Sequence, residues 1–96
     1  MLKNIDQKLL TLDGLPASDG QKEVSIKDVI LDCLMDATLM PSDATGEQKL
    51  EQYLLAVRCK NCGEIEFTVE ELSLLKKLAG KKYAPLVVGQ FYQFCD

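Results

Sequence analysis

Residues 64–80 have the sequence EIEFTVEELSLLKKLAG, and this stretch predicts the fold class most clearly. Its first four residues alternate between polar and apolar, as expected of a short strand. Thr68 and Glu71 then form the T-x-x-E pattern of a capping box, which marks the start of a helix. Apolar residues recur at helical spacing over residues 69–79, and Gly80 is the expected terminator. A short strand followed by a capped amphipathic helix indicates an α+β fold.

A similar unit occurs earlier in the chain. Residues 24–29, VSIKDV, match residues 67–72, FTVEEL, in having a hydroxyl cap and an acidic first turn. Ser25 is the expected cap of a helix that begins at Ile26 and ends before Pro41. One interpretation is an internal repeat whose two strands pair antiparallel and whose helices pack together. The other is that any strand followed by a capped helix has this pattern.

The remaining elements complete a small helical domain. A T-x-x-Q capping box starts a second helix, which is expected to end at residues 58–59 and to bury Leu50, Tyr53, Leu54 and Val57. A last helix is expected from Pro85. Residues 8–12 and 23–25 suggest a hairpin with a loop over residues 15–21. The prediction is a single mainly helical α+β domain over residues 1–96, with about four helices and a two- or three-stranded β element.

The composition excludes several classes of function. The chain is 47% hydrophobic and 27% charged, as in an ordinary folded domain, and contains no histidine. An imidazole base, a histidine metal ligand and a histidine pH switch are therefore excluded. The sequence has no phosphate-binding loop or dinucleotide fingerprint either. We expect a protein that is not an enzyme, needs no cofactor, has no signal peptide or membrane helix and lies in the cytoplasm.

The four cysteines suggest a metal site only weakly. Cys59 and Cys62 form a C-x-x-C-G pattern, as in the knuckle of a zinc ribbon, but a structural zinc needs four ligands. Cys33 and Cys95 fall on apolar helix faces and are expected to be small core residues. A redox role is disfavoured because the pair follows the C-terminus of a helix. A zinc-stabilised module that uses Cys59 and Cys62 stays open as an alternative function.

The charge is unevenly distributed. Residues 1–75 hold 7 basic and 14 acidic side chains, whereas residues 76–96 hold four lysines and one aspartate. The lysines Lys76, Lys77, Lys81 and Lys82 suggest a second alternative, a regulator associated with nucleic acid. Against it, the net charge is -4 and lysines at a helix C-terminus are ordinary partners of the helix dipole. Nucleic acid is therefore not the expected partner.

The C-terminal segment is the most apolar and aromatic part of the chain. Four of the six aromatic residues lie in its last 14 positions, and the apolar side chains point to several sides of the expected helix. Such a helix is either central to the core or shared with another chain. We therefore expect self-association or docking of a protein partner, with candidate contacts at Lys81, Lys82, Tyr83, Phe91, Tyr92 and Phe94.

Three segments carry a resemblance to a known group of proteins. LLTLDG at residues 9–14, VSIKDVI at residues 24–30 and TVEELSLLKKLAGKKYAPLVVGQFYQF at residues 68–94 resemble small phage- and prophage-encoded accessory proteins. The C-K-N-C-G segment is not part of the resemblance. The resemblance implies a non-enzymatic protein in virion assembly or host modulation, and it implies no functional residues.

Overall fold

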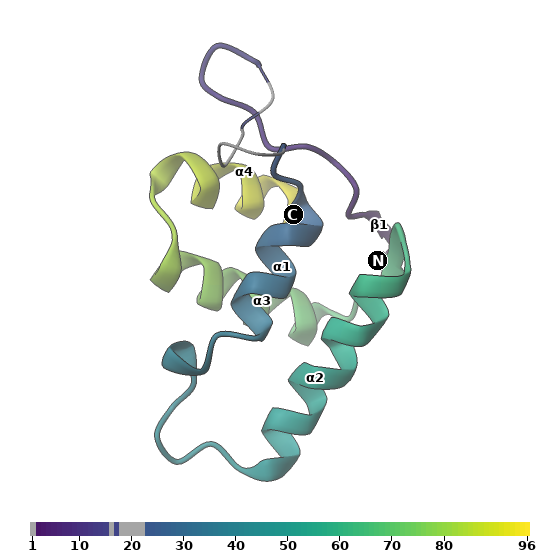
Figure 1. Ribbon diagram of the computed structural model, residues 1–96, viewed down its shortest axis with the longest axis vertical. Helices are drawn as coiled ribbons and strands as arrows, with labels where there is room; N and C mark the ends of the chain where they lie inside the picture. Colours follow the sequence, from purple (N-terminus) through teal and green to yellow (C-terminus); the bar gives the residue numbers. More distant parts are fainter. Residues whose placement is uncertain (1, 16, 18–22) are drawn as a thin grey trace.

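The computed structural model describes residues 2–15, 17 and 23–96 (Figure 1). Within them lie four α-helices and a two-stranded antiparallel sheet, which confirms the predicted mainly helical α+β class. In chain order the elements are β1 (Leu2–Asn4), α1 (Ile26–Leu34), the 3₁₀ helix η1 (Ala37–Leu39), α2 (Gly46–Asn61), β2 (Glu64–Glu66), α3 (Val69–Lys82) and α4 (Pro85–Cys95).

Reciprocal capping boxes fix the starts of three helices. At α3 the Thr68 hydroxyl accepts from the Glu71 amide at 3.1 Å, and the Glu71 carboxylate accepts from the Thr68 amide at 2.9 Å. The same two-way arrangement starts α1 and α2. Each box satisfies backbone donors that have no partner inside the helix. The predicted positions of all three caps are confirmed.

The sheet differs from the predicted hairpin. β1 pairs with β2, with Lys3 opposite Ile65, whereas residues 8–12 form no strand. Lys8 makes an isolated antiparallel bridge with Ser25, flanked by backbone hydrogen bonds from Leu9 to Val24 and from Ile26 to Gln7. The pairing does not continue past Thr11, because the Thr11 amide donates to the Leu15 carbonyl within a local turn. Most of the loop predicted to close the hairpin, residues 18–21 together with Pro16, lies outside the described residues.

The pairing of β1 with β2 also bears on the internal repeat. The two segments that precede the caps, residues 23–25 and 64–66, do not pair with each other as the repeat requires. The helices that follow, α1 and α3, do pack together. The similarity between the two units is therefore one of helix caps and helix packing, and the predicted strand pairing is wrong.

Helix ends differ from the prediction at three places. α1 stops at Leu34, where the Asp36 carboxylate binds the backbone and hydroxyl of Thr38 and so favours a turn. α2 continues to Asn61, beyond its expected end at residues 58–59. α3 continues through Gly80 to Lys82. A β-carbon on Gly80 would lie 2.9 Å from the Tyr92 hydroxyl, so glycine there makes room for α4 and does not end the helix.

Helix α1 lies at the centre of the packing. It packs against α2 and α3, and α4 packs against α3 (Figure 1). Strand β2 connects the end of α2 to the start of α3. The largest side chains of the shared core that are almost completely buried are Ile5, Val29, Ile30, Phe67, Leu75 and Phe91. This arrangement leaves α2 at one edge of the molecule, with one side facing away from the other helices.

Candidate functional site

The aromatic residues expected to anchor a partner are divided between core and surface. Phe91 is 0% exposed and Phe94 is 9% exposed. Phe94 stacks edge-on against Phe67, with ring centroids 6.4 Å apart, and lies 5.7 Å from Phe91. These two phenylalanines hold α4 on the core, so they present little surface to a partner in this structure. Tyr92 remains exposed on the outer side of α4.

Lys82 and Tyr83 bind within the molecule. The Lys82 ammonium lies 2.6 Å from Asp36 and 3.2 Å from Asp32, and the Tyr83 hydroxyl donates to Asp32. The hydrogen bond from Lys82 lowers the pKa of Asp36 to about 2. Burial, followed by the hydrogen bond to Asp32, raises the pKa of Tyr83. These contacts attach the end of α3 to α1, so both side chains already have partners inside the fold.

The four lysines of the basic segment have different surroundings. Lys76 pairs with Asp96 and lies 5.5 Å from the ring centre of Tyr92. Lys82 faces the two carboxylates described above. Lys77 and Lys81 line a groove between α3 and α2. Two of the four positive charges are therefore matched by carboxylates, which weakens the case for a surface that follows a phosphate backbone.

The cysteines do not converge. Cys59 is completely buried in the last turn of α2, whereas Cys62 is exposed. Cys33 and Cys95 are buried, which confirms that they are core residues. Burial raises the pKa of each buried thiol to about 11. Within the described residues, no three or more His, Cys, Asp or Glu side chains are grouped so that they could hold a metal ion.

Helix α2 presents an apolar stripe to solvent. The stripe consists of four side chains, with exposed fractions of 54%, 55%, 51% and 38% in chain order: Leu50, Tyr53, Leu54 and Val57. The sequence predicted that this face would be buried. The buried residues of α2 are instead Leu55, Ala56 and Cys59, two of which are small and allow α2 to approach α1 closely. The stripe is therefore left without a partner in the described part of the chain.

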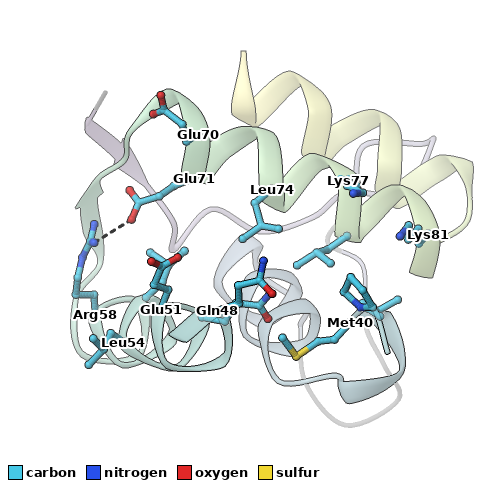
Figure 2. A pocket seen from close by; sticks show the side chains of 15 residues that line it. Met40, Gln48, Glu51, Leu54, Arg58, Glu70, Glu71, Leu74, Lys77 and Lys81 are labelled. Atoms are coloured by element: carbon cyan, nitrogen blue, oxygen red, sulfur yellow. Dashed lines mark hydrogen bonds and ion pairs between the residues drawn. The ribbon is translucent and has the colours of Figure 1, made fainter. Parts of the chain in front are cut away.

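A groove of about 530 Å³ runs beside the stripe (Figure 2). It lies between α2, α3 and the segment after η1, and Leu54 belongs to both the groove and the stripe. Its apolar lining consists of Leu39, Met40, Pro41, Leu54, Leu55, Leu74 and Leu78. An apolar groove between two helices is a shape that accepts an amphipathic helix or an extended apolar side chain.

Charged residues mark the two ends of the groove. Glu70, Glu71 and Arg58 lie at one end, and Lys77 and Lys81 lie at the other (Figure 2). The Arg58 guanidinium donates to the Glu71 carboxylate at 3.1 Å and to the Glu66 carbonyl at 2.8 Å. It thereby links the end of α2 to the start of α3. The groove thus has an apolar floor and a rim of both charge signs.

Sequence reasoning missed this site although its residues carried a signal. Leu50, Tyr53, Leu54 and Val57 form one apolar stripe of α2, whereas Leu55, Ala56 and Cys59 form a second one on another side. A surface helix needs only one buried stripe. Two stripes on one helix indicate that one of them faces something other than the core of this chain.

The search for related proteins adds nothing to this site. No protein-family model, curated protein or solved structure matches the chain. Separately, none of the helices in the described residues has the length and apolar character needed to cross a lipid bilayer. Any functional conclusion therefore depends on the geometry of the chain itself.

Proposed function

We propose that the protein is a non-enzymatic interaction module that binds another protein surface through the stripe on α2 and the adjoining groove. The observation that carries the proposal is the exposure of four large apolar side chains at i, i+3, i+4 and i+7 on one helix. Single exposed apolar residues are common, but a contiguous stripe beside an apolar groove is typical of a docking surface.

The proposal changes the surface that the sequence suggested. Phe91 and Phe94 are buried, and Lys82 and Tyr83 bind Asp32 of α1. Of the original candidates, Lys81 lies at the groove and Tyr92 on the far side of α3, where it contacts Lys76. The α2 stripe supplies the apolar anchors that the buried phenylalanines cannot.

We keep the biological setting that the resemblance implies. A small phage- or prophage-derived protein in virion assembly or host modulation, in the cytoplasm of the host, would need a docking surface and no catalytic centre. The zinc and nucleic-acid alternatives are not adopted because, among the described residues, no further ligand joins Cys59 and Cys62 in a metal-binding group, and two of the lysines face carboxylates.

Affinity capture from cells of the native host tests the proposal. The bait is either the wild type or a Leu50→Lys/Val57→Lys variant, whose two lysines interrupt the exposed stripe without removing core side chains. Val69→Lys is the matched control, because Val69 is 67% exposed and lies on α3, outside the stripe and the groove. We expect the wild type and the control to retain the same protein, and the stripe variant to lose it.

The opposite result would overturn the proposal. If the proteins retained are the same for all three baits, the α2 stripe does not bind them. Circular dichroism at the same temperature confirms that each bait is folded, so that loss of capture reports the surface and not unfolding.

A further inference from the structure

We infer that the α2 stripe binds the same stripe on a second copy of this chain, with the two α2 helices antiparallel. The inference rests on the proposed function and names the partner that it requires. It is drawn from the spacing of the apolar residues and from the charges that border them.

The stripe is nearly symmetric about its own centre. If a two-fold axis passes between Tyr53 and Leu54, Leu50 packs against the partner's Val57. Tyr53 and Leu54 then each meet their own copy near the axis. All four exposed side chains are covered at once, which a two-fold pairing achieves with a single patch.

The charges on one flank of the stripe favour the antiparallel direction. Glu47, Glu51 and Arg58 lie at spacings of four and seven residues, so they share the flank next to the groove. In the antiparallel pair the partner's Arg58 comes level with the space between Glu47 and Glu51. In a parallel pair this flank would instead face the partner's other flank, so that Glu47 and Glu51 lie beside the partner's Lys49 but Arg58 lies beside the partner's Lys60. The Arg58 side chain is 48% exposed, and it adds a positive charge to this flank while its guanidinium keeps its hydrogen bonds to Glu71 and Glu66.

The other flank carries a mismatch that makes the pairing testable. Lys49 and Lys60 are eleven residues apart, close to three helical turns, and share the flank away from the groove. The antiparallel pair brings Lys49 beside the partner's Lys60. Charge reversals on the two flanks should therefore act in opposite directions, which an unspecific apolar association would not produce.

The size of the stripe sets the strength of the association. A stable interface takes roughly 20–30 residues from each partner, whereas this contact uses one face of a helix and its flanks. We therefore expect a weak dimer that dissociates on dilution.

Sedimentation equilibrium over a concentration series tests the inference directly. The wild type should shift from monomer towards dimer as its concentration rises, and Leu54→Lys should remain monomeric. Val69→Lys should behave as the wild type. A wild type that stays monomeric throughout the concentration range in which it remains soluble would overturn the inference.

Two single charge reversals test the direction of the pairing. Glu51→Lys places a lysine beside the partner's Arg58 at two symmetric positions and should weaken the dimer roughly fivefold or more. Lys49→Glu places a carboxylate beside the partner's Lys60 and should tighten the antiparallel dimer by several fold, whereas in a parallel pair it would lie beside the partner's Glu47 and Glu51 and weaken the dimer. Both effects should shrink in high salt, which screens exposed charges. Two shifts in the same direction, or no shift in either variant, would rule out the antiparallel register.

The two proposals fail in different ways. If the wild type is monomeric but still retains a host protein through the stripe, the partner is not a second copy and the interaction module stands. If neither dimer nor stripe-dependent capture is found, both proposals fail. Melting temperatures equal to that of the wild type show that a variant has kept its fold.

Discussion

At the scale of single residues, the surroundings of a side chain decide its role more than its type does. Cys59 belongs to a C-x-x-C-G pattern typical of zinc sites but lies in the core. Phe94 belongs to an aromatic segment but packs on Phe67. Gly80 lies inside a helix, where an added β-carbon would lie 2.9 Å from the Tyr92 hydroxyl. Gly89 lies inside α4 with open space around it, so it has no such requirement.

The contrast between the two glycines gives a prediction. Gly89→Ala should stabilise the protein by about 1 kcal/mol, because alanine loses less backbone entropy in a helix and meets no neighbour within 4 Å. Gly80→Ala should give a smaller gain, since its β-carbon displaces the Tyr92 hydroxyl. Urea unfolding of both variants checks this, and a destabilised Gly89→Ala protein would contradict it.

A second prediction concerns the buried amide of α2. Gln52 Oε1 is buried and has no hydrogen-bond partner among the described residues. The substitution Gln52→Met removes this unsatisfied acceptor and keeps the length of the side chain. The free energy of unfolding should therefore rise by about 1 kcal/mol, as measured by urea titration. Gln48→Met, on the exposed start of the same helix, removes a capping group and should instead lower stability.

At the scale of secondary-structure elements, local side-chain bonds fix where helices start, and tertiary contacts fix where they end. The three capping boxes are encoded in four-residue patterns. The end of α3 depends on Lys82 and Tyr83, which bind Asp32 and Asp36 of a segment far away in the chain.

The link between Lys82 and Asp36 should make stability depend on pH. The pKa of Asp36 falls from its ordinary value of 3.8 to about 2 in the folded protein. A lowered folded-state pKa stabilises the fold fully above the ordinary value, and the contribution is lost as the pH falls through about 2. Wild type should therefore lose more stability than Asp36→Asn over this interval.

Urea midpoints measured at several pH values between 5 and 2 check this dependence. Asp43→Asn serves as the control, because Asp43 is exposed in the next loop and forms no ion pair among the described residues. Its acid response should match that of the wild type. An Asp36→Asn protein with an unchanged acid response would show that the ion pair contributes nothing to stability.

The capping boxes can be compared in the same way. Thr68→Ala should cost about 1 kcal/mol, because the Glu71 amide loses its acceptor at the start of α3. Thr68→Ser keeps the hydroxyl and should retain most of the stability. Thermal unfolding of the pair checks this, and equal losses in both variants would contradict a capping role.

At the scale of the whole molecule, α1 lies at the centre, and the other helices differ in how far their neighbours cover them. α3 packs against both α1 and α4, whereas α2 packs against α1 and β2 and leaves its apolar stripe exposed. The core is completed by Phe67, Phe91 and Phe94 from the second half of the chain. The aromatic side chains of α4 fill the core, whereas one apolar face of α2 is exposed. The candidate surface therefore lies on α2.

This division gives a last prediction. Phe91→Ala should destabilise the protein by about 3–5 kcal/mol, because it leaves a cavity where a fully buried ring packs. Tyr92→Ala, at the neighbouring exposed position, should cost far less. Thermal or urea unfolding distinguishes the two, and similar small losses would show that Phe91 is not a core residue.

The sequence by itself determined the fold class and the starts of the helices. Capping boxes and apolar spacing are local properties, so Ser25, Thr45 and Thr68 identify helix starts without knowledge of the fold. The absence of histidine likewise excluded imidazole chemistry from the beginning.

Only the tertiary structure decided which apolar faces are buried and which strands pair. α2 and α4 both carry more apolar residues than one buried face needs, so their spacing alone could not say which side meets the core. Packing settled this: Ala56 and Cys59 let α2 approach α1 and left Leu50 and Tyr53 outside, whereas Phe91 and Phe94 filled the core. Likewise β1 pairs with β2 through contacts between residues about sixty positions apart, which no local pattern encodes.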